Sequence, residues 1–412
     1  MSNQQRFLDF VQLVHDLERP FDDLLADPTI DRRLTIAATG RCFHDCLHCS
    51  AEPSHRGQDL PLEAIARSDP VIISLFKGVH FGRDGEALTL GSRLKGDGMT
   101  EAIGPTLPEY LAVLHGFGIT DFVIDTKGVA PGDAVAHEAL PKTFAYVKDR
   151  GLSLLTRISF NLYSPDVYHE TDQEKQIALL EQRLMEVLPA ALEAGKVQIS
   201  AVGSFKYDKS HIFRTRRYLD TILARNGFER QGQYAQVIAL GVQDQEAHLD
   251  RETRMLRSMS GGAGFGIMAD LATPLDAFVS AYRQEISGKV VDVKYSQANN
   301  LGRWARYKDK GVEQNPVEWW QPRGADWSGS ICGVLSTERM TLFTDGTLAP
   351  CNGNYADEIR FARIDEGAEA VFSKLRDFHA LLRTAYLADI YDIMLGKKTS
   401  WTCKMEGLRS AG

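Results

Sequence analysis

The sequence predicts an α/β protein with a parallel sheet, built as a complete or partial α/β barrel. Short apolar runs alternate with longer helical patterns, and 43% of the 412 residues are hydrophobic, which is enough for a large core. Strands that alternate with helices are typical of βαβ units, in which the strands run parallel. The expected strands are 34–38, 87–91, 119–125, 153–161, 197–202, 234–240 and 290–295. The expected helices are 135–150, 172–195, 211–226 and 274–287.

Segments of different character flank this alternating pattern. Residues 5–25 have the pattern of one or two amphipathic helices, and 303–330 is polar and aromatic without a regular period. A further long helix is expected over 367–395. The predicted domains are an N-terminal helical extension over 1–32, a core domain over 33–305 and a small C-terminal α+β domain over 306–412.

Composition and charge exclude several classes of function. The net charge of −8 does not favour binding to nucleic acid or to an anionic membrane. No signal peptide and no apolar run long enough to span a bilayer is found, so a cytoplasmic location without a membrane partner is expected. In a reducing compartment, the six cysteines favour metal binding or redox chemistry over disulfides. Neither a G-x-G-x-x-G after a first strand nor a Walker loop is present, which disfavours hydride or phosphoryl transfer.

Three cysteines lie close together directly after the first expected strand. Cys42, Cys46 and Cys49 have the spacing C-x3-C-x2-C. Cysteine thiolates are the usual ligands of iron–sulfur clusters, and three of them leave one iron of a cubane open to another ligand. The alternative is a structural zinc site, in which His44 or His48 would complete a Cys3His set.

This motif resembles the cluster motif of the radical S-adenosylmethionine (SAM) superfamily. Members often have an aromatic residue or a histidine before the third cysteine, and His48 occupies that place. The resemblance implies a partial (β/α)6 TIM-like barrel, with a [4Fe-4S] cluster and SAM at the C-terminal mouth of the strands. It also implies that an electron from a donor such as flavodoxin or ferredoxin cleaves SAM. The 5′-deoxyadenosyl radical formed then abstracts a substrate hydrogen.

The resemblance further implies contacts to SAM outside the cysteine loop. Family members carry a Gly-rich segment after the second strand, often ending in Gly-Glu-Pro. We take residues 96–98 as its counterpart, although the proline is missing and the acid is an aspartate. Polar residues near the ends of later strands commonly reach the ribose, the carboxylate or the adenine. An ordinary turn or strand end is the alternative for each. The residues expected to contact SAM are Gly96, Asp97, Gly98, Ser159, Asn161, Ser200 and Asn300.

A second group of cysteines lies in the C-terminal segment. Cys332 and Cys351 flank a hairpin predicted by the Asp-Gly pair at 345–346, and Cys403 lies farther downstream. The spacing C-x13-G-x4-C resembles the half-motif of SPASM and twitch domains, which implies an auxiliary iron–sulfur cluster held by the three cysteines. Those domains use seven or four cysteines. Here Glu406 as a ligand, an open site that binds substrate, and a zinc site are the alternatives.

Three functions follow from these features. The first is radical chemistry on a small-molecule biosynthetic intermediate. The second is radical modification of a peptide or protein, and the third is a non-catalytic zinc-binding module. Peptide-modifying members often carry an extra N-terminal recognition domain, whereas here 33 residues precede the first expected strand. We therefore expect a small-molecule substrate.

Overall fold

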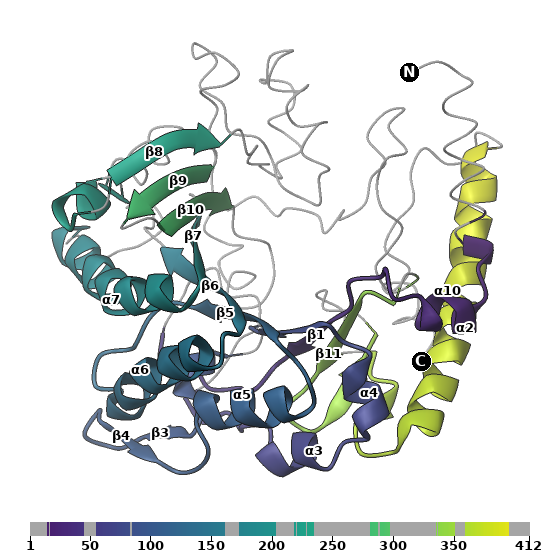
Figure 1. The fold of residues 1–412 in the computed structure, drawn as a ribbon. Coiled ribbons are helices and arrows are strands. Elements are labelled where there is room, and N and C mark those ends of the chain that lie inside the picture. Colours follow the sequence, from purple (N-terminus) through teal and green to yellow (C-terminus); the bar gives the residue numbers. More distant parts are fainter. Residues whose placement is uncertain are drawn as a thin grey trace, which may run out of the picture.

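The computed structural model describes a large parallel sheet and the helices that cover it (Figure 1). The described residues are 15, 17–44, 55–82, 85–160, 173–202, 218–219, 221–227, 229–234, 281–286, 289–296, 335, 337–350 and 359–394. The helices are α2 (Phe21–Ala26), α3 (Leu62–Ala66), α4 (Pro70–Ser74), the 3-10 helix η1 (Ala87–Thr89), α5 (Leu107–Gly116), α6 (Ala134–Asp149), α7 (Gln173–Ala194) and α10 (Ala368–Met394). The strands are β1 (Arg33–Ile36), β2 (Gly78–Phe81), β3 (Ser92–Leu94), β4 (Thr100–Ala102), β5 (Asp121–Thr126), β6 (Ser153–Phe160), β7 (Lys196–Val202), β8 (Glu229–Tyr234), β9 (Ala281–Ile286), β10 (Lys289–Ser296), β11 (Arg339–Leu342), β12 (Thr347–Ala349) and β13 (Ala362–Arg363).

The parallel strands lie in the order β11-β1-β2-β5-β6-β7-β10. Antiparallel strands extend the sheet at both sides, β12 and β13 beyond β11, and β9 and β8 beyond β10. From β1 to β7, neighbouring strands of this sheet follow one another in the chain with helices between them, which is the βαβ arrangement. The predicted mixed α/β fold with a parallel sheet is confirmed.

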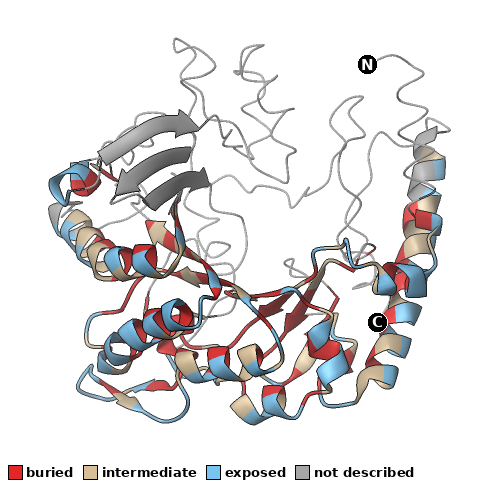
Figure 2. Ribbon diagram, in the orientation of Figure 1, coloured by how far each residue is buried: buried red, intermediate tan, exposed pale blue. Residues whose placement is uncertain are grey.

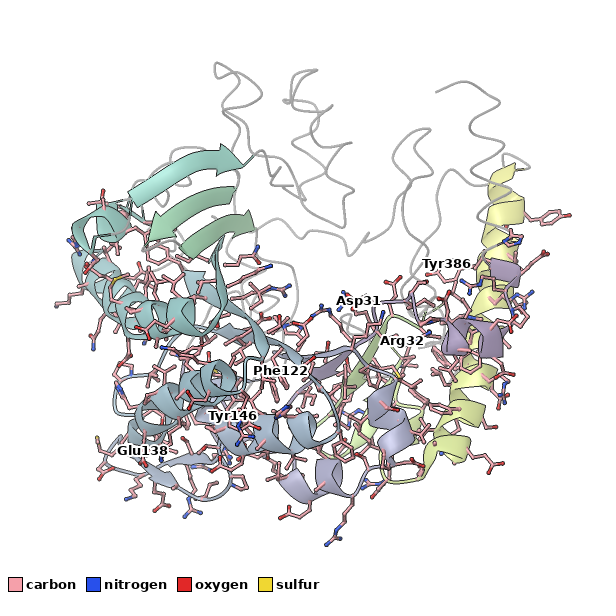
Figure 3. The ribbon with its side chains drawn as sticks, viewed as in Figure 1. Asp31, Arg32, Phe122, Glu138, Tyr146 and Tyr386 are labelled. Carbon is pink, nitrogen blue, oxygen red and sulfur yellow. The ribbon has the colours of Figure 1, made fainter. Side chains whose placement is uncertain are left out.

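The two faces of the sheet differ in polarity because successive side chains of a strand point to opposite faces. Phe122 and Ile124 of β5 are buried in the main apolar cluster, together with residues of the covering helices such as Leu111 of α5. Phe122 lies between the sheet and the helices (Figure 3), and buried residues are concentrated in this layer (Figure 2). The alternate residues of the same strand, Asp121 and Asp125, belong to the other face, here called the inner face.

Polar side chains fix the beginnings of two helices. Thr106 and Glu109 form a capping box at α5. Asp133 precedes α6 and accepts a hydrogen bond from the first turn of that helix. The same buried carboxylate accepts the hydroxyl of Ser92 at 3.0 Å and that of Thr100 at 2.9 Å. The cap of α6 therefore also holds the β3–β4 hairpin in place.

Most of the predicted elements are confirmed. The strands expected at 34–38, 119–125, 153–161, 197–202 and 290–295 are β1, β5, β6, β7 and β10, and the helices expected at 135–150, 172–195 and 367–395 are α6, α7 and α10. The hairpin at 345–346 is confirmed as the pair β11–β12, with Gly346 at a φ of 80°. Of 5–25, residues 15, 17–18 and 21–25 are helical, and Arg19 and Pro20 interrupt the helices; of 211–226, residues 218–219 and 221–225 are helical. Of 234–240 only the last residue of β8 is described.

Two predicted elements are wrong. Residues 87–91 do not form a strand: Ala87–Thr89 form η1, which Glu86 caps through the backbone N–H of Leu88. A short apolar run is buried in either conformation, so its composition does not distinguish them. The helix expected at 274–287 is also wrong, because Ala281–Ile286 form β9, antiparallel to β10. The Ser-Gly pair at 287–288, between two runs of six and eight residues, is the hairpin signal that this prediction overlooked.

Part of the C-terminal segment joins the same sheet as the core. β11 pairs with β1 in parallel, and the backbone N–H of Ala368, at the start of α10, donates to Asp69 before α4 at 2.9 Å. The predicted boundary between 305 and 306 lies outside the described residues, so the domain division stays a prediction. Of the described helices, none is long and apolar enough to cross a membrane.

Candidate functional site

The loop after β1 fixes Cys42, the first of the predicted cluster ligands, beyond the C-terminal end of that strand. Arg41 forms an ion pair with Asp59 and donates to the carbonyl of Gly57 at 3.0 Å. Cys42 is 8% exposed, and its Sγ accepts a hydrogen bond from the backbone N–H of His44 at 3.4 Å. Hydrogen bonds to a cysteine sulfur tune its properties as a cluster ligand. The Cys42 thiol is therefore held in an environment suited to metal binding.

The loop after β2 lies directly against this cysteine loop. A Cβ atom on Gly85 would collide with the backbone carbonyl oxygens of Thr39 and Arg41. The backbone N–H of Glu86 donates to the carbonyl of Arg41 at 3.0 Å. Glycine at position 85 thus permits an approach between the two loops that a larger residue would prevent.

The Glu86 side chain joins the loop after β2 to the loop after β5. It is buried, and its carboxylate accepts the backbone N–H of Lys127 at 2.8 Å and that of Leu88 at 3.3 Å. Burial raises the pKa of Glu86 to about 7, while the hydrogen bonds from Lys127, Thr126 and Leu88 act in the opposite direction. Near neutral pH, the buried carboxyl is therefore close to the midpoint of its titration.

His44 links the cysteine loop to the loop after β5. Its Nε2 lies 2.9 Å from the carbonyl oxygen of Gly128, and because a carbonyl only accepts, Nε2 carries the hydrogen. Burial, followed by the charges of Lys127 and Arg183, lowers the pKa of His44 to about 3, so the ring is neutral. Its Nδ1 is buried and has no hydrogen bond within the described structure. Since an unprotonated ring nitrogen can bind zinc, the geometry is compatible with both interpretations of the cysteine loop.

Only some of the predicted site residues are described. Ser159 of β6 lies opposite Ser200 of β7, of which the backbone alone is described. Among the described residues, no three potential ligands are grouped as a metal site. The predicted residues outside the described ranges are Cys46, Cys49, Asn161, Asn300, Cys332, Cys351 and Cys403.

Gly96, Asp97 and Gly98 form the exposed turn between β3 and β4. Oδ1 of Asp97 accepts the backbone N–H of Met99 at 3.0 Å, and Gly98 has a φ of 82°. Both features are those of a turn. These residues were assigned to SAM because 87–91 was taken as the second strand, and that premise is wrong since β2 is Gly78–Phe81. Their contact with SAM stays a prediction that has lost its original support.

The sequence analysis missed Gly85 and Glu86. The signal was present, because Gly82-Arg-Asp-Gly85-Glu86-Ala87 follows the run Gly-Val-His-Phe at 78–81. That run is only four residues long and begins with a glycine, so its strand character was not recognised.

Comparisons with known proteins give little further information. No family model and no curated protein matches this chain. The structure of SuiB from Streptococcus suis bound to the precursor peptide SuiA shows 10% identity and a TM-score of 0.31, over 78% of this chain and 60% of that one. The FeFe-hydrogenase maturase HydG from Carboxydothermus hydrogenoformans shows 16% identity and a TM-score of 0.28, over 54% of this chain and 47% of that one. The chain thus spans less than two thirds of the length of either protein, and these TM-scores carry no argument about its function.

Proposed function

We propose that this chain is a radical SAM enzyme with a partial (β/α)6 barrel. The observation that carries the proposal is the position of the C-x3-C-x2-C motif. It follows β1 of a parallel sheet whose successive strands lie side by side, and at its described beginning Arg41 contacts the loop after β2 and His44 the loop after β5. In α/β proteins, binding and catalytic groups gather beyond the C-terminal ends of such strands.

The residues at this edge fit the proposed cofactors. Cys42, Cys46 and Cys49 would hold a [4Fe-4S] cluster, and the buried, hydrogen-bonded thiol of Cys42 suits that role. The Gly85-Glu86 segment follows β2, where the family carries Gly-Glu-Pro, and we assign the amino group of SAM to its backbone. When bound, the cluster and SAM supply a radical that removes a hydrogen atom from the substrate.

The described side chains position the loops around this site. Glu86 connects the loop after β2 to the loop after β5, and the neutral His44 ring connects the cysteine loop to that same segment. Because both side chains are buried, they also keep water from the space between the three loops.

The C-terminal cysteines complete the proposal. Cys332 comes before β11 and Cys351 comes directly after the β11–β12 hairpin, which supports a common ligand site for these two thiols. With Cys403, they would hold an auxiliary iron–sulfur cluster in the segment 306–412. The proposed electron donor is a flavodoxin or a ferredoxin.

The test is SAM cleavage by the anaerobically reconstituted chain, measured as 5′-deoxyadenosine formed in the presence of a reductant. Wild-type chain should contain about eight irons if both clusters form and about four if only the first does. Cys46→Ala should abolish cleavage, while the neighbouring substitution Ser50→Ala should not. Zinc without iron after anaerobic preparation, or cleavage unchanged in Cys46→Ala, would contradict the proposal; the first result would favour the zinc-binding module.

A further inference from the structure

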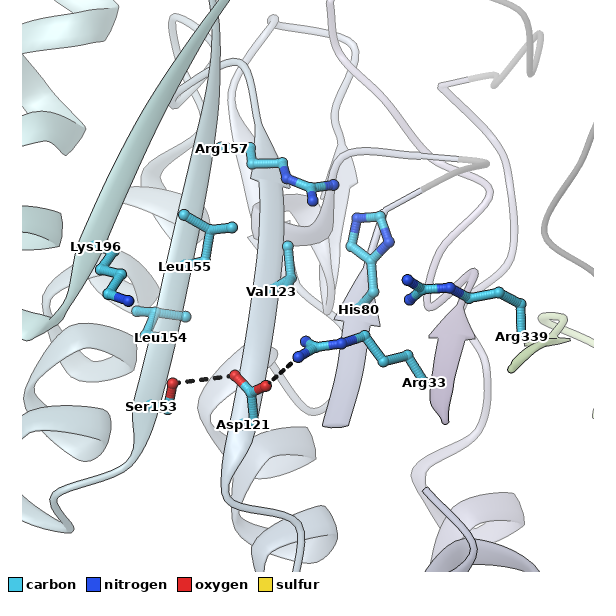
Figure 4. A pocket seen from close by; sticks show the side chains of 10 residues that line it. All are labelled: Arg33, His80, Asp121, Val123, Ser153, Leu154, Leu155, Arg157, Lys196 and Arg339. Carbon is cyan, nitrogen blue, oxygen red and sulfur yellow. Dashed lines mark hydrogen bonds and ion pairs between the residues drawn. The ribbon is translucent and has the colours of Figure 1, made fainter. Parts of the chain in front are cut away.

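The inner face of the sheet carries a cavity of about 480 Å³, away from the cysteine loop (Figure 4). Several of its lining residues, such as Arg33, Lys196 and Arg339, are the first residues of their strands. The cavity therefore lies toward the N-terminal ends of the strands. Its volume is in the range of pockets that take small organic ligands.

Strand alternation and register gather basic side chains in this cavity. Arg33 of β1 lies opposite Arg339 of β11, although the two are 306 positions apart in the sequence. Lys196 of β7 lies opposite Leu155 of β6, and Arg157 follows two residues later on the same face. The cavity is thus lined by four basic side chains, Arg33, Arg157, Lys196 and Arg339, in a chain whose net charge is −8.

Two of these basic groups are paired with acids. Arg33 lies 2.5 Å from Asp121. Arg157 lies 3.8 Å from Asp125, which exceeds hydrogen-bond distance, and Asp125 is hydrogen-bonded to His80 at 2.7 Å instead. Nε of Arg157 is buried and has no hydrogen-bond partner in the described structure. The guanidinium of Arg157 is therefore only partly neutralised.

Arg339 is half-buried in the cavity and has no hydrogen bond and no ion pair with any described residue, whereas Lys196 is exposed and lines the rim. Burial, and next the positive charge of Arg33, lower the pKa of Arg339, while the carboxylates of Glu338 and Asp31 act in the opposite direction. A partly buried charge without a hydrogen-bonded partner is costly, and such a group in a cavity is typical of a binding site for a ligand of opposite charge.

We propose that this cavity binds an anionic group, carboxylate or phosphate, of a small-molecule substrate through Arg157 and Arg339. The charge of Arg157 is among those that lower the pKa of Arg339, so the two guanidinium groups are near each other, and two such groups from separate strands suit an anion with several acceptor oxygens. β1 rises about 10 Å over the three steps from Arg33 to Ile36, and Cys42 lies beyond that end. A molecule held here by its anionic end would have to extend farther than this span to reach the cysteine loop. The assignment of the anion as part of the substrate rests on the proposed function.

The test is calorimetric titration of the reconstituted full chain with pyrophosphate and, separately, with succinate. The double variant Arg157→Gln/Arg339→Gln should weaken the binding of the preferred probe about tenfold or more, since each charge-assisted hydrogen bond is worth about that factor. Lys142→Gln removes the same charge from an exposed pair on α6 and should leave binding unchanged. Tighter binding of pyrophosphate would indicate a phosphate ester, and tighter binding of succinate a carboxylate.

The charge-conserving pair Arg157→Lys/Arg339→Lys separates a loss of charge from a loss of fold, because it should retain most of the binding that the Gln double variant loses. Absence of saturable binding of both probes to wild-type chain, or equal binding by the wild type and the Gln double variant, would overturn the inference. SAM cleavage is measured on the same preparations. Cleavage without anion binding overturns this inference alone, whereas anion binding through these residues without cleavage overturns the proposed function alone.

Discussion

The substitution Glu86→Gln tests the buried connection between the loops after β2 and β5. Glutamine has nearly the shape of glutamate but cannot ionise, so the variant removes the titration and keeps most of the packing. In the wild type, burial raises the pKa of Glu86 to about 7 from an ordinary value of 4.5. The folded chain therefore retains a proton over a pH range in which the unfolded chain has lost it.

The sign and size of the effect follow from this difference. A carboxyl with a raised pKa contributes stability that is fully present below about pH 4.5 and is lost as the pH rises through about 7. A shift of this size corresponds to about 3 kcal/mol, since each pKa unit is worth about 1.4 kcal/mol. The free energy of unfolding of the wild type should thus fall by about 3 kcal/mol relative to Glu86→Gln across this window.

The measurement is urea unfolding of wild type and variant over a pH series, followed by tryptophan fluorescence. Subtracting the free energy of unfolding of the variant from that of the wild type at each pH cancels the contributions of the other titrating groups. Glu63→Gln, which changes an exposed carboxyl on α3, serves as the control and should show a small, nearly constant difference. If the difference between wild type and Glu86→Gln is constant over the window, Glu86 does not have a raised pKa and the inferred burial is wrong.

Two further predictions concern the same sheet. Gly85→Ala should push the loop after β2 away from the cysteine loop and lower the iron retained per chain, whereas Gly104→Ala, where a Cβ would meet open space, should not. Retention of iron in both variants would refute the close approach. Phe122→Ala removes a fully buried side chain and should lower the free energy of unfolding by about 3–5 kcal/mol. Val71→Ala, at a position 53% exposed, should cost far less, and similar losses would contradict the assignment of faces.

Strand length decides how much of the fold could be read from the sequence. The run 153–161 was predicted because it is long and largely apolar, and β6 has eight residues with buried side chains at alternate positions. β2 has only four residues and begins with Gly78, which fits between Asp121 and Arg33 of the neighbouring strands. Four residues are too few to show a strand pattern. β2 is defined by its pairing with β1 and β5, which a local sequence pattern does not show.

The same distinction applies to the site. Cys42, Cys46 and Cys49 could be recognised because three thiols within eight residues are a local signal. The position of Glu86 after β2 could have been recognised, but its buried connection could not, since its main hydrogen-bond donor is the backbone of Lys127, 41 positions away. The sequence shows an ordinary glutamate beside a glycine. Only the pairing of β2 with β5 makes it a buried group with a displaced pKa.

The contrast between the two faces of the sheet explains how the chain can hold unpaired charge without losing its fold. The face toward the helices consists of fully buried apolar residues such as Leu34, Ile36 and Phe122, whose burial provides the main stabilisation. The inner face can then carry Arg339, which has no hydrogen bond or ion pair with a described residue, and Arg157, whose buried Nε has no hydrogen-bond partner there, at a cost that the apolar layer offsets. A sheet selected for stability alone would place an acid opposite each cation, as Asp121 lies beside Arg33. These two incompletely satisfied cations are therefore better explained by a ligand than by folding.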